Sequence, residues 1–227
     1  MTDSPPLDNR LVFAGFAIAA GLLSFLLIGS AGGPPPPAPA ELLPYFEAHR
    51  GRYILLGVAV LTWVGTAIPF IAGLGALLAP QGRALARAAM LLAAGGVLLL
   101  GFATFAFVGA FSAVSAAARV APSPAEAAYQ AAIWSHLSFY LTDPGLMTLG
   151  LGQFLFAVLA WKSGSLPKLV AAIGLVGGLA GLLTLAVYET AALALAQLTA
   201  FGVWGLATGV ILLRRPGPSR DATAPQR

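Results

Sequence analysis

The chain has 227 residues, of which 59% are hydrophobic and only 9% are charged, against about 25% charged residues in soluble domains. This composition excludes an ordinary soluble protein. The net charge of +4 does not indicate nucleic-acid binding, because the basic residues are spread over the ends of apolar segments, as topology signals are. The absence of cysteine excludes disulfides, thiolate metal sites and cysteine nucleophiles.

Six long apolar segments have uncharged interiors. A helix needs about 20 apolar residues to cross a hydrocarbon core about 30 Å thick, and backbone polar groups in lipid must be paired within the helix. The sequence therefore predicts an all-α, polytopic transmembrane bundle, with a single domain at 11–213, a tail at 1–10 and a disordered tail at 214–227. The predicted membrane-spanning segments are residues 11–30, 53–78, 88–114, 145–161, 168–188 and 192–213.

The first segment could be a signal peptide, because Gly29-Ser30-Ala31 resembles a cleavage site. Its apolar run of about 19 residues exceeds the usual 7–15 of a signal core, so we expect an uncleaved helix. The next connection has four consecutive prolines at 34–37, which favour an extended polyproline stretch. We interpret it as a spacer, with a docking surface for a partner as the alternative. Residues 41–50 after it are predicted to form a short helix on the outer membrane surface.

Proline and glycine residues occur inside several of the predicted helices. Pro69 lies between Gly65 and Gly73 on one helix face and predicts a kink, which we interpret as a packing feature rather than a gating hinge. Small residues four apart predict close helix approach. These pairs are Gly174/Gly178, Gly177/Gly181 and Gly205/Gly209.

The second outer connection carries a helix-start signal. Ser123 followed by Pro124 and Glu126 is a capping box with proline at the first helical position. We predict an amphipathic outer helix over residues 124–141 that lies on the membrane or caps the bundle. Pro144 should end it, because the residue before a proline is steered out of the α region. The apolar face of this predicted helix is Tyr129, Ile133, Leu137 and Tyr140.

Basic residues are concentrated on one side of the predicted topology. The side with both termini carries nine: Arg10, Arg83, Arg87, Lys162, Lys168, Arg214, Arg215, Arg220 and Arg227. The other side carries three: Arg50, Arg52 and Arg119. Because cytoplasmic connections are rich in Lys and Arg, both termini are predicted to be cytoplasmic. Abundant Ala, Gly, Pro and Arg suggest a bacterial source, and hence the cytoplasmic (inner) membrane.

Uncharged polar side chains inside the segments form one candidate site. Such groups either join helices by hydrogen bonds or line a small cavity, and both interpretations stay open. Without an intramembrane charge, we expect no ion-coupled transport, no haem held by paired histidines and no other cofactor. The candidate cavity residues are Trp63, Thr66, Thr104, Gln153, Gln197 and Trp204.

Histidines and acids in the outer connections form a second candidate site. A His and carboxylate group of this kind could bind a metal such as Zn²⁺ or support hydrolysis. The ligand spacing of known motifs is absent, so we assign no catalytic or metal-binding residue and interpret the group as a solvated outer face. Its members are Glu47, His49, Glu126, His136, Asp143 and Glu189.

Two stretches resemble a known family. Residues 155–168, followed by the glycine-rich run 173–178, and the ending 204–215 are similar to the bacterial membrane family catalogued as domain of unknown function 4386. The resemblance implies about six helices over residues 10–215. It supplies no activity and no site residues, and the four prolines at 34–37 depart from the family pattern.

Three functional classes remain open. We favour a non-enzymatic membrane protein that acts as a scaffold, sensor or assembly partner, because the motifs of the other classes are missing. The first alternative is a passive binder or carrier of a small apolar molecule or lipid. The second is a membrane enzyme that uses the outer-face group. In each case the expected surroundings are the lipid bilayer, with a membrane-protein partner or a second copy of the chain.

Overall fold

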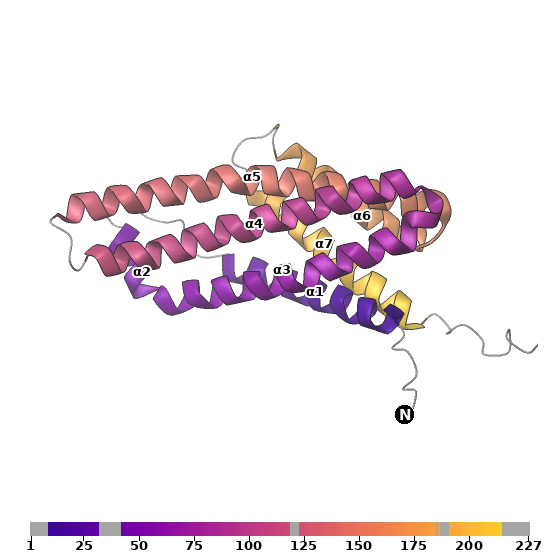
Figure 1. Cartoon of the computed structure of the whole chain (residues 1–227), viewed down its shortest axis with the longest axis horizontal. Coiled ribbons are helices and arrows are strands. Elements are labelled where there is room, and N and C mark those ends of the chain that lie inside the picture. Colours follow the sequence, from indigo (N-terminus) through magenta and orange to yellow (C-terminus); the bar gives the residue numbers. More distant parts are fainter. Residues whose placement is uncertain (1–8, 32–41, 119–122, 185, 187–190, 215–227) are drawn as a thin grey trace, which may run out of the picture.

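The computed structural model describes residues 9–31, 42–118, 123–184, 186 and 191–214. Within these ranges the chain is all-α and has no strand, as predicted (Figure 1). The polyproline stretch and the C-terminal tail lie outside the described residues. The helices are α1 (Asn9–Ala31), α2 (Leu42–Ala48), α3 (Arg50–Leu78), the 3-10 turn η2 (Ala79–Gln81), α4 (Arg83–Ala118), α5 (Pro124–Ser163), α6 (Lys168–Leu183) and α7 (Ala191–Arg214).

In the part of the chain that the structure describes, five helices are long and apolar enough to cross a membrane. The predicted span 168–188 is not among them, because α6 has 16 residues and is about 24 Å long, less than the roughly 30 Å of a hydrocarbon core. Six spans are therefore not established. The five candidate spans are Asn9–Ile28, Arg50–Gln81, Arg83–Val108, Ala132–Ser163 and Ala192–Arg214.

The six longer helices form a closed ring in chain order. Each packs against the next, from α1 to α3, α4, α5, α6 and α7, and α7 packs back against α1. Aromatic rings fill the centre: Phe70 lies 5.8 Å from Trp204 and Trp63 lies 5.9 Å from Phe201, measured between ring centroids. All four side chains are at most 1% exposed. The ring therefore encloses a packed core rather than a channel.

Glycines let the helix backbones touch. A Cβ atom built on Gly96 of α4 would overlap the backbone of Leu149 on α5, and one built on Gly205 of α7 would lie 2.9 Å from the carbonyl oxygen of Ala17 on α1. On α6, a Cβ at Gly178 would lie 2.7 Å from the backbone nitrogen of Phe154. The close approach that the small-residue spacing predicted is thus confirmed for α6 and α7.

The start of α5 follows the capping-box prediction. Ser123 has extended backbone angles, φ −152° and ψ 141°, and its Oγ accepts a hydrogen bond of 3.3 Å from the backbone amide of Glu126. This bond satisfies one of the unpaired amides of the first helical turn. Residues 42–48 also form the short helix expected in the first outer connection, α2.

The prediction that Pro144 ends the outer helix is wrong. Residues 124–163 form one α-helix of 40 residues, with Pro144 inside it. Threonine side chains pair with carbonyls on either side: Thr142 Oγ1 donates to the Ser138 oxygen at 2.8 Å, and Thr148 Oγ1 donates to the Pro144 oxygen at 2.6 Å. Pro144 has no amide hydrogen for the carbonyl oxygen of Tyr140, four residues earlier, and the two threonine bonds do not replace that bond. Packing supports the helix at this point, because a Cβ on Gly145 would lie 2.9 Å from Cγ of Leu100 on α4, and proline is tolerated in membrane helices that neighbouring helices support.

The predicted apolar face of the outer helix does not cover the bundle. Tyr129 and Tyr140 are 66% exposed, Ile133 is 44% exposed and Leu137 is 38% exposed. The helices that carry this region are long: α4 has 36 residues and α5 has 40, or about 54 Å and 60 Å. Their hairpin projects at the end of the bundle where α2 also lies (Figure 1).

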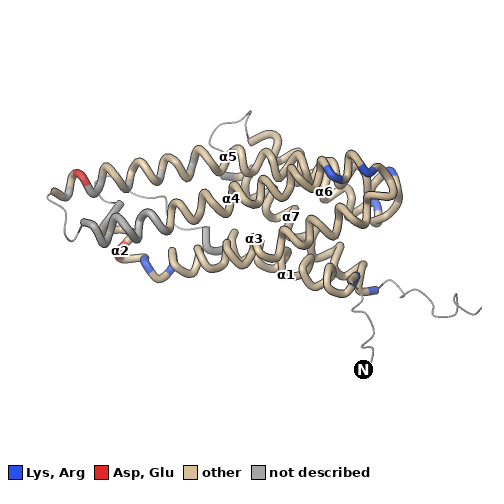
Figure 2. The backbone as a smooth tube through the Cα atoms, in the orientation of Figure 1, with Lys and Arg blue, Asp and Glu red and all other residues tan. Residues whose placement is uncertain are grey.

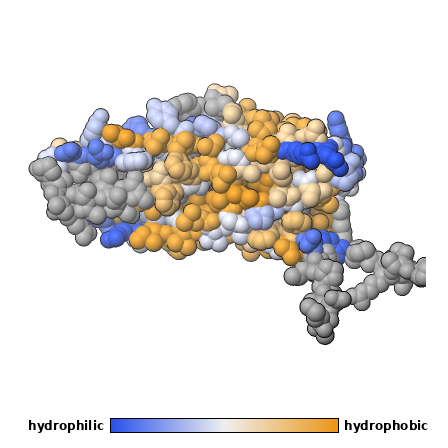
Figure 3. Space-filling view, viewed as in Figure 1, coloured by the Kyte–Doolittle hydropathy of each residue, from blue (hydrophilic) through white to orange (hydrophobic). Residues whose placement is uncertain are grey.

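The two ends of the bundle differ in their charged residues. An apolar band covers the middle of the visible face (Figure 3). Basic residues gather at the end that holds the start of α1 and the end of α7 (Figure 2). Arg50 and Arg52 lie in the first turn of α3 and Glu126 lies in the first turn of α5, away from the basic ends of these helices. The described basic residues of the first end, called here the basic end, are Arg10, Arg83, Arg87, Lys162, Lys168 and Arg214.

Candidate functional site

The polar side chains predicted inside the bundle divide into two groups. Gln153 and Gln197 are fully buried, and Trp63 and Trp204 are 1% exposed. The two threonines bond instead to their own helices. Thr66 Oγ1 donates to the Thr62 oxygen at 3.1 Å and to the Trp63 oxygen at 3.0 Å, and Thr104 Oγ1 donates to the Leu100 oxygen at 3.0 Å.

A buried hydrogen-bond chain joins α3 to α1. Trp63 Nε1 donates to Ser24 Oγ at 2.9 Å, and Ser24 Oγ donates to the Ala20 oxygen at 2.8 Å. Both side chains are in the core. Trp63 therefore acts as a link between helices. Sequence reasoning missed Ser24, although a single hydroxyl in the middle of an apolar segment is the signal that could have identified it.

Between α5, α6 and α7 several buried polar atoms have no protein partner. Gln197 Nε2 donates to the Leu146 oxygen at 2.7 Å, which ties α7 to α5. Among the described residues, no hydrogen bond reaches Gln197 Oε1, either amide atom of Gln153, Trp204 Nε1 or Thr208 Oγ1. Unpaired buried groups are uncommon in native proteins and are costly in a low-dielectric interior.

The glycine face of α6 receives these polar side chains. A Cβ atom on Gly177 would lie 2.6 Å from Gln153 Nε2, and one on Gly181 would lie 2.5 Å from Gln197 Nε2. A Cβ on Gly174 would lie 3.1 Å from Trp204 Nε1. Gly174, Gly177 and Gly181, on one face of α6, therefore leave space for polar groups of α5 and α7. Their role is more specific than helix approach alone.

The outer-face residues do not form one cluster in the part of the chain that the structure describes. Nδ1 of His49 lies 2.8 Å from the Tyr45 oxygen, and Nδ1 of His136 lies 2.8 Å from the Ala132 oxygen. Because a carbonyl oxygen only accepts, each Nδ1 carries a proton and is occupied by its own chain.

The acids of the same group are dispersed. Glu47 and Glu126 are exposed and Asp143 is half-buried, while Glu189 lies outside the described residues. Within the described ranges, no group of three or more His, Asp or Glu side chains could hold a metal ion.

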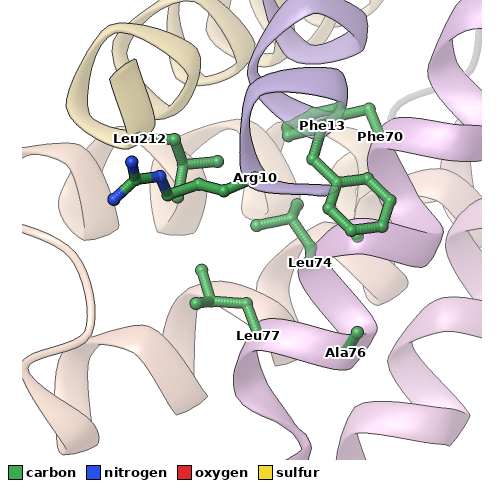
Figure 4. Close-up of a pocket in the computed structure, with 8 residues that line it drawn as sticks. Arg10, Phe13, Phe70, Leu74, Ala76, Leu77 and Leu212 are labelled. Atoms are coloured by element: carbon green, nitrogen blue, oxygen red, sulfur yellow. The ribbon is translucent and has the colours of Figure 1, made fainter. Parts of the chain in front are cut away.

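A pocket of about 220 Å³ opens at the basic end between α1, α3 and α7. Arg10 and Leu212 lie on one side of it and Phe13 and Phe70 on the other (Figure 4). Apart from Arg10 the lining is apolar: Phe13, Phe70, Gly73, Leu74, Ala76, Leu77 and Leu212. Sequence reasoning missed this pocket and treated Arg10 only as a topology signal. The convergence of three helices creates the pocket, and no local pattern encodes it.

The family model described as Domain of unknown function (DUF4386) matches residues 11–215. The chain belongs to this family. The match confirms the resemblance noted in residues 155–178 and 204–215. No curated protein and no solved structure matches the chain. DUF4386 carries no assigned activity in its description, so any function must be argued from the arrangement of side chains.

Proposed function

We propose that this DUF4386 protein is a non-catalytic membrane protein that assembles with a partner protein through the outer part of α5. The observation that supports this is the exposed apolar face Tyr129, Ile133, Leu137 and Tyr140, called here the outer stripe. These residues lie at i, i+4, i+8 and i+11, so they share one side of the helix.

The length of α5 supports the location of the outer stripe outside the hydrocarbon core. The candidate span Ala132–Ser163 includes Ile133, Leu137 and Tyr140, but its 32 residues exceed the about 20 that cross a bilayer core. Counting about 20 residues back from the basic end of α5 reaches about residue 143, and we assign this part of the candidate span to the core. Most of the outer stripe then lies in or beyond the headgroup layer. Tyrosine is favoured there, but exposed Ile and Leu favour burial against a protein surface, and contiguous apolar patches commonly mark such contacts.

Two further features bear on the proposal. Among the described residues, no group of three or more His, Asp or Glu side chains could hold a metal ion. The basic end, with the start of α1 and the end of α7, is proposed to face the cytoplasm, because Lys and Arg accumulate on that side. The outer stripe would then face the opposite compartment and meet its partner there.

Site-specific photocrosslinking in native membranes tests the proposal. A benzophenone amino acid at Ile133 should give a discrete protein adduct. The same probe at Leu98, which is 54% exposed on α4 within the candidate span of that helix, is the matched control and should give only lipid adducts. An adduct of twice 23.1 kDa identifies a second copy of the chain, and another mass identifies a different protein. Lipid adducts alone at Ile133 would refute the proposal.

A further inference from the structure

The pocket at the basic end combines an apolar lining with one cationic side chain. Its volume of about 220 Å³ exceeds that of an apolar cavity of about 150 Å³ that admits benzene. Ala76 is exposed, so the pocket opens on the outer surface of the bundle. In a membrane that surface is covered by lipid chains, and a chain can enter without crossing the core.

The walls are arranged to keep this space open. A Cβ atom on Gly73 would lie 2.5 Å from Cδ1 of Phe13, so the absence of a side chain at position 73 lets the Phe13 ring lie against α3. Phe70 and Leu74 are almost completely buried, at 1% and 2% exposed, and form the inner wall. Phe70 in turn packs on Trp204 in the centre of the ring. The pocket is therefore bounded by the rigid aromatic core.

The positive charge at the pocket indicates which class of ligand it binds. Of the described residues that line the pocket, Arg10 is the one with a charge, and its guanidinium lies beside Leu212 (Figure 4). Guanidinium groups bind phosphate with paired, charge-assisted hydrogen bonds. Arg214, two residues beyond Leu212, adds positive charge at the same end. Anionic lipids are the membrane components that basic residues near a bilayer surface attract.

We propose that this pocket binds one acyl chain of an anionic phospholipid, with the lipid phosphate at Arg10. The chain lies against Phe13, Phe70 and Leu77, and the second chain of the lipid stays in the surrounding bilayer. The site is separate from the outer stripe, at the other end of the bundle. Its occupancy does not depend on the assembly proposed above.

Native mass spectrometry of the full chain in mild detergent tests this site. The probes are phosphatidylglycerol and phosphatidylcholine with identical acyl chains. The wild-type protein should retain one phosphatidylglycerol in preference to phosphatidylcholine. Arg10→Gln should reduce that preference about tenfold, the effect of losing one charge-assisted hydrogen bond. Arg87→Gln is the matched control, since Arg87 is exposed at the same end and does not line the pocket.

A second variant tests the position of the acyl chain. Ala76→Trp should fill the pocket from an exposed position and abolish the retained lipid, while helix content and monodisperse elution stay unchanged. Leu77→Trp provides the same test if Ala76→Trp does not fold. Inorganic phosphate should not compete with the lipid, and competition would assign the site to a free anion. The proposal would be overturned if the wild-type protein retained the two lipids equally, or if Arg10→Gln and Arg87→Gln had equal effects. It would also be overturned if the Trp variant that fills the pocket retained phosphatidylglycerol as fully as the wild type.

Discussion

The two buried glutamines should respond differently to the same substitution, with Gln153→Met the more stabilising of the two changes. Gln153→Met replaces an amide whose two polar atoms have no protein partner with an unbranched apolar side chain of similar shape. An unsatisfied buried polar group costs about 1–3 kcal/mol, and part of this cost is lost in a membrane protein because the unfolded state also finds partners. We therefore expect Gln153→Met to stabilise the bundle by about 1–2 kcal/mol.

Gln197→Met is the matched comparison. This substitution removes the 2.7 Å hydrogen bond from Gln197 Nε2 to the Leu146 oxygen, and such bonds between membrane helices contribute about 0.6 kcal/mol on average and up to about 1.7. Both amides lie on the glycine face of α6, against Gly177 and Gly181. The change in shape is therefore similar at the two positions. Gln197→Met also removes one unpartnered atom, Oε1, so we expect it to stabilise the bundle less than Gln153→Met does, and the difference in free energy of unfolding between the two variants reports the hydrogen bond of Gln197.

The assay is equilibrium unfolding in mixed micelles, in which SDS is titrated into a mild detergent and helix content is followed by circular dichroism. Each variant is compared with the wild type at the same protein concentration. Destabilisation by 1 kcal/mol or more in Gln153→Met, about the size of one lost hydrogen bond, would refute the reasoning. It would mean that the Gln153 amide has a partner in the membrane, such as a bound water or small polar molecule.

Three other predictions concern the start of α5, the contact between α4 and α5, and the orientation. Ser123→Ala should cost about 0.5–2 kcal/mol of local helix stability and speed amide hydrogen exchange in the first turn of α5; unchanged exchange would contradict the cap. Gly96→Ala should destabilise the bundle by about 1–3 kcal/mol through overpacking, whereas Gly65→Ala, with open space around its Cβ, should not; equal effects would rule out the backbone contact. Ser123→Cys should react with a membrane-impermeant thiol reagent in intact cells and Gln81→Cys should not, and the reverse pattern would invert the orientation.

Hydropathy alone located the helices because burial in lipid is a local property of each segment. Five of the six predicted segments correspond to helices long enough to span. The end of the predicted outer helix was placed wrongly at Pro144, because the steric rule before proline is a local preference that ignores tertiary packing. A Cβ on Gly145 would lie 2.9 Å from Cγ of Leu100, so α4 supports α5 at this point.

Four of the candidate interior residues, Trp63, Gln153, Gln197 and Trp204, are buried, while Thr66 and Thr104 are half-buried, and the partners of the buried residues were not predicted. The bond from Trp63 to Ser24 joins residues 39 positions apart, and the bond from Gln197 to Leu146 spans 51 positions. Sequence periodicity within one segment carries no information on such pairs. The ring order of the helices and the pocket at Arg10 depend on the same long-range packing, so neither could be read from local patterns.

The size of the complex extracted from native membranes tests the proposed assembly most directly. The variant carries Ile133→Lys and Leu137→Lys, which place two charges on the outer stripe. Both side chains are exposed, so the substitutions leave the buried core of the bundle unchanged. We expect the wild-type protein to elute as a complex larger than one 23.1 kDa chain with its detergent. The double variant should elute as a single chain with unchanged helix content. Identical elution of the two proteins would contradict assembly through the outer stripe.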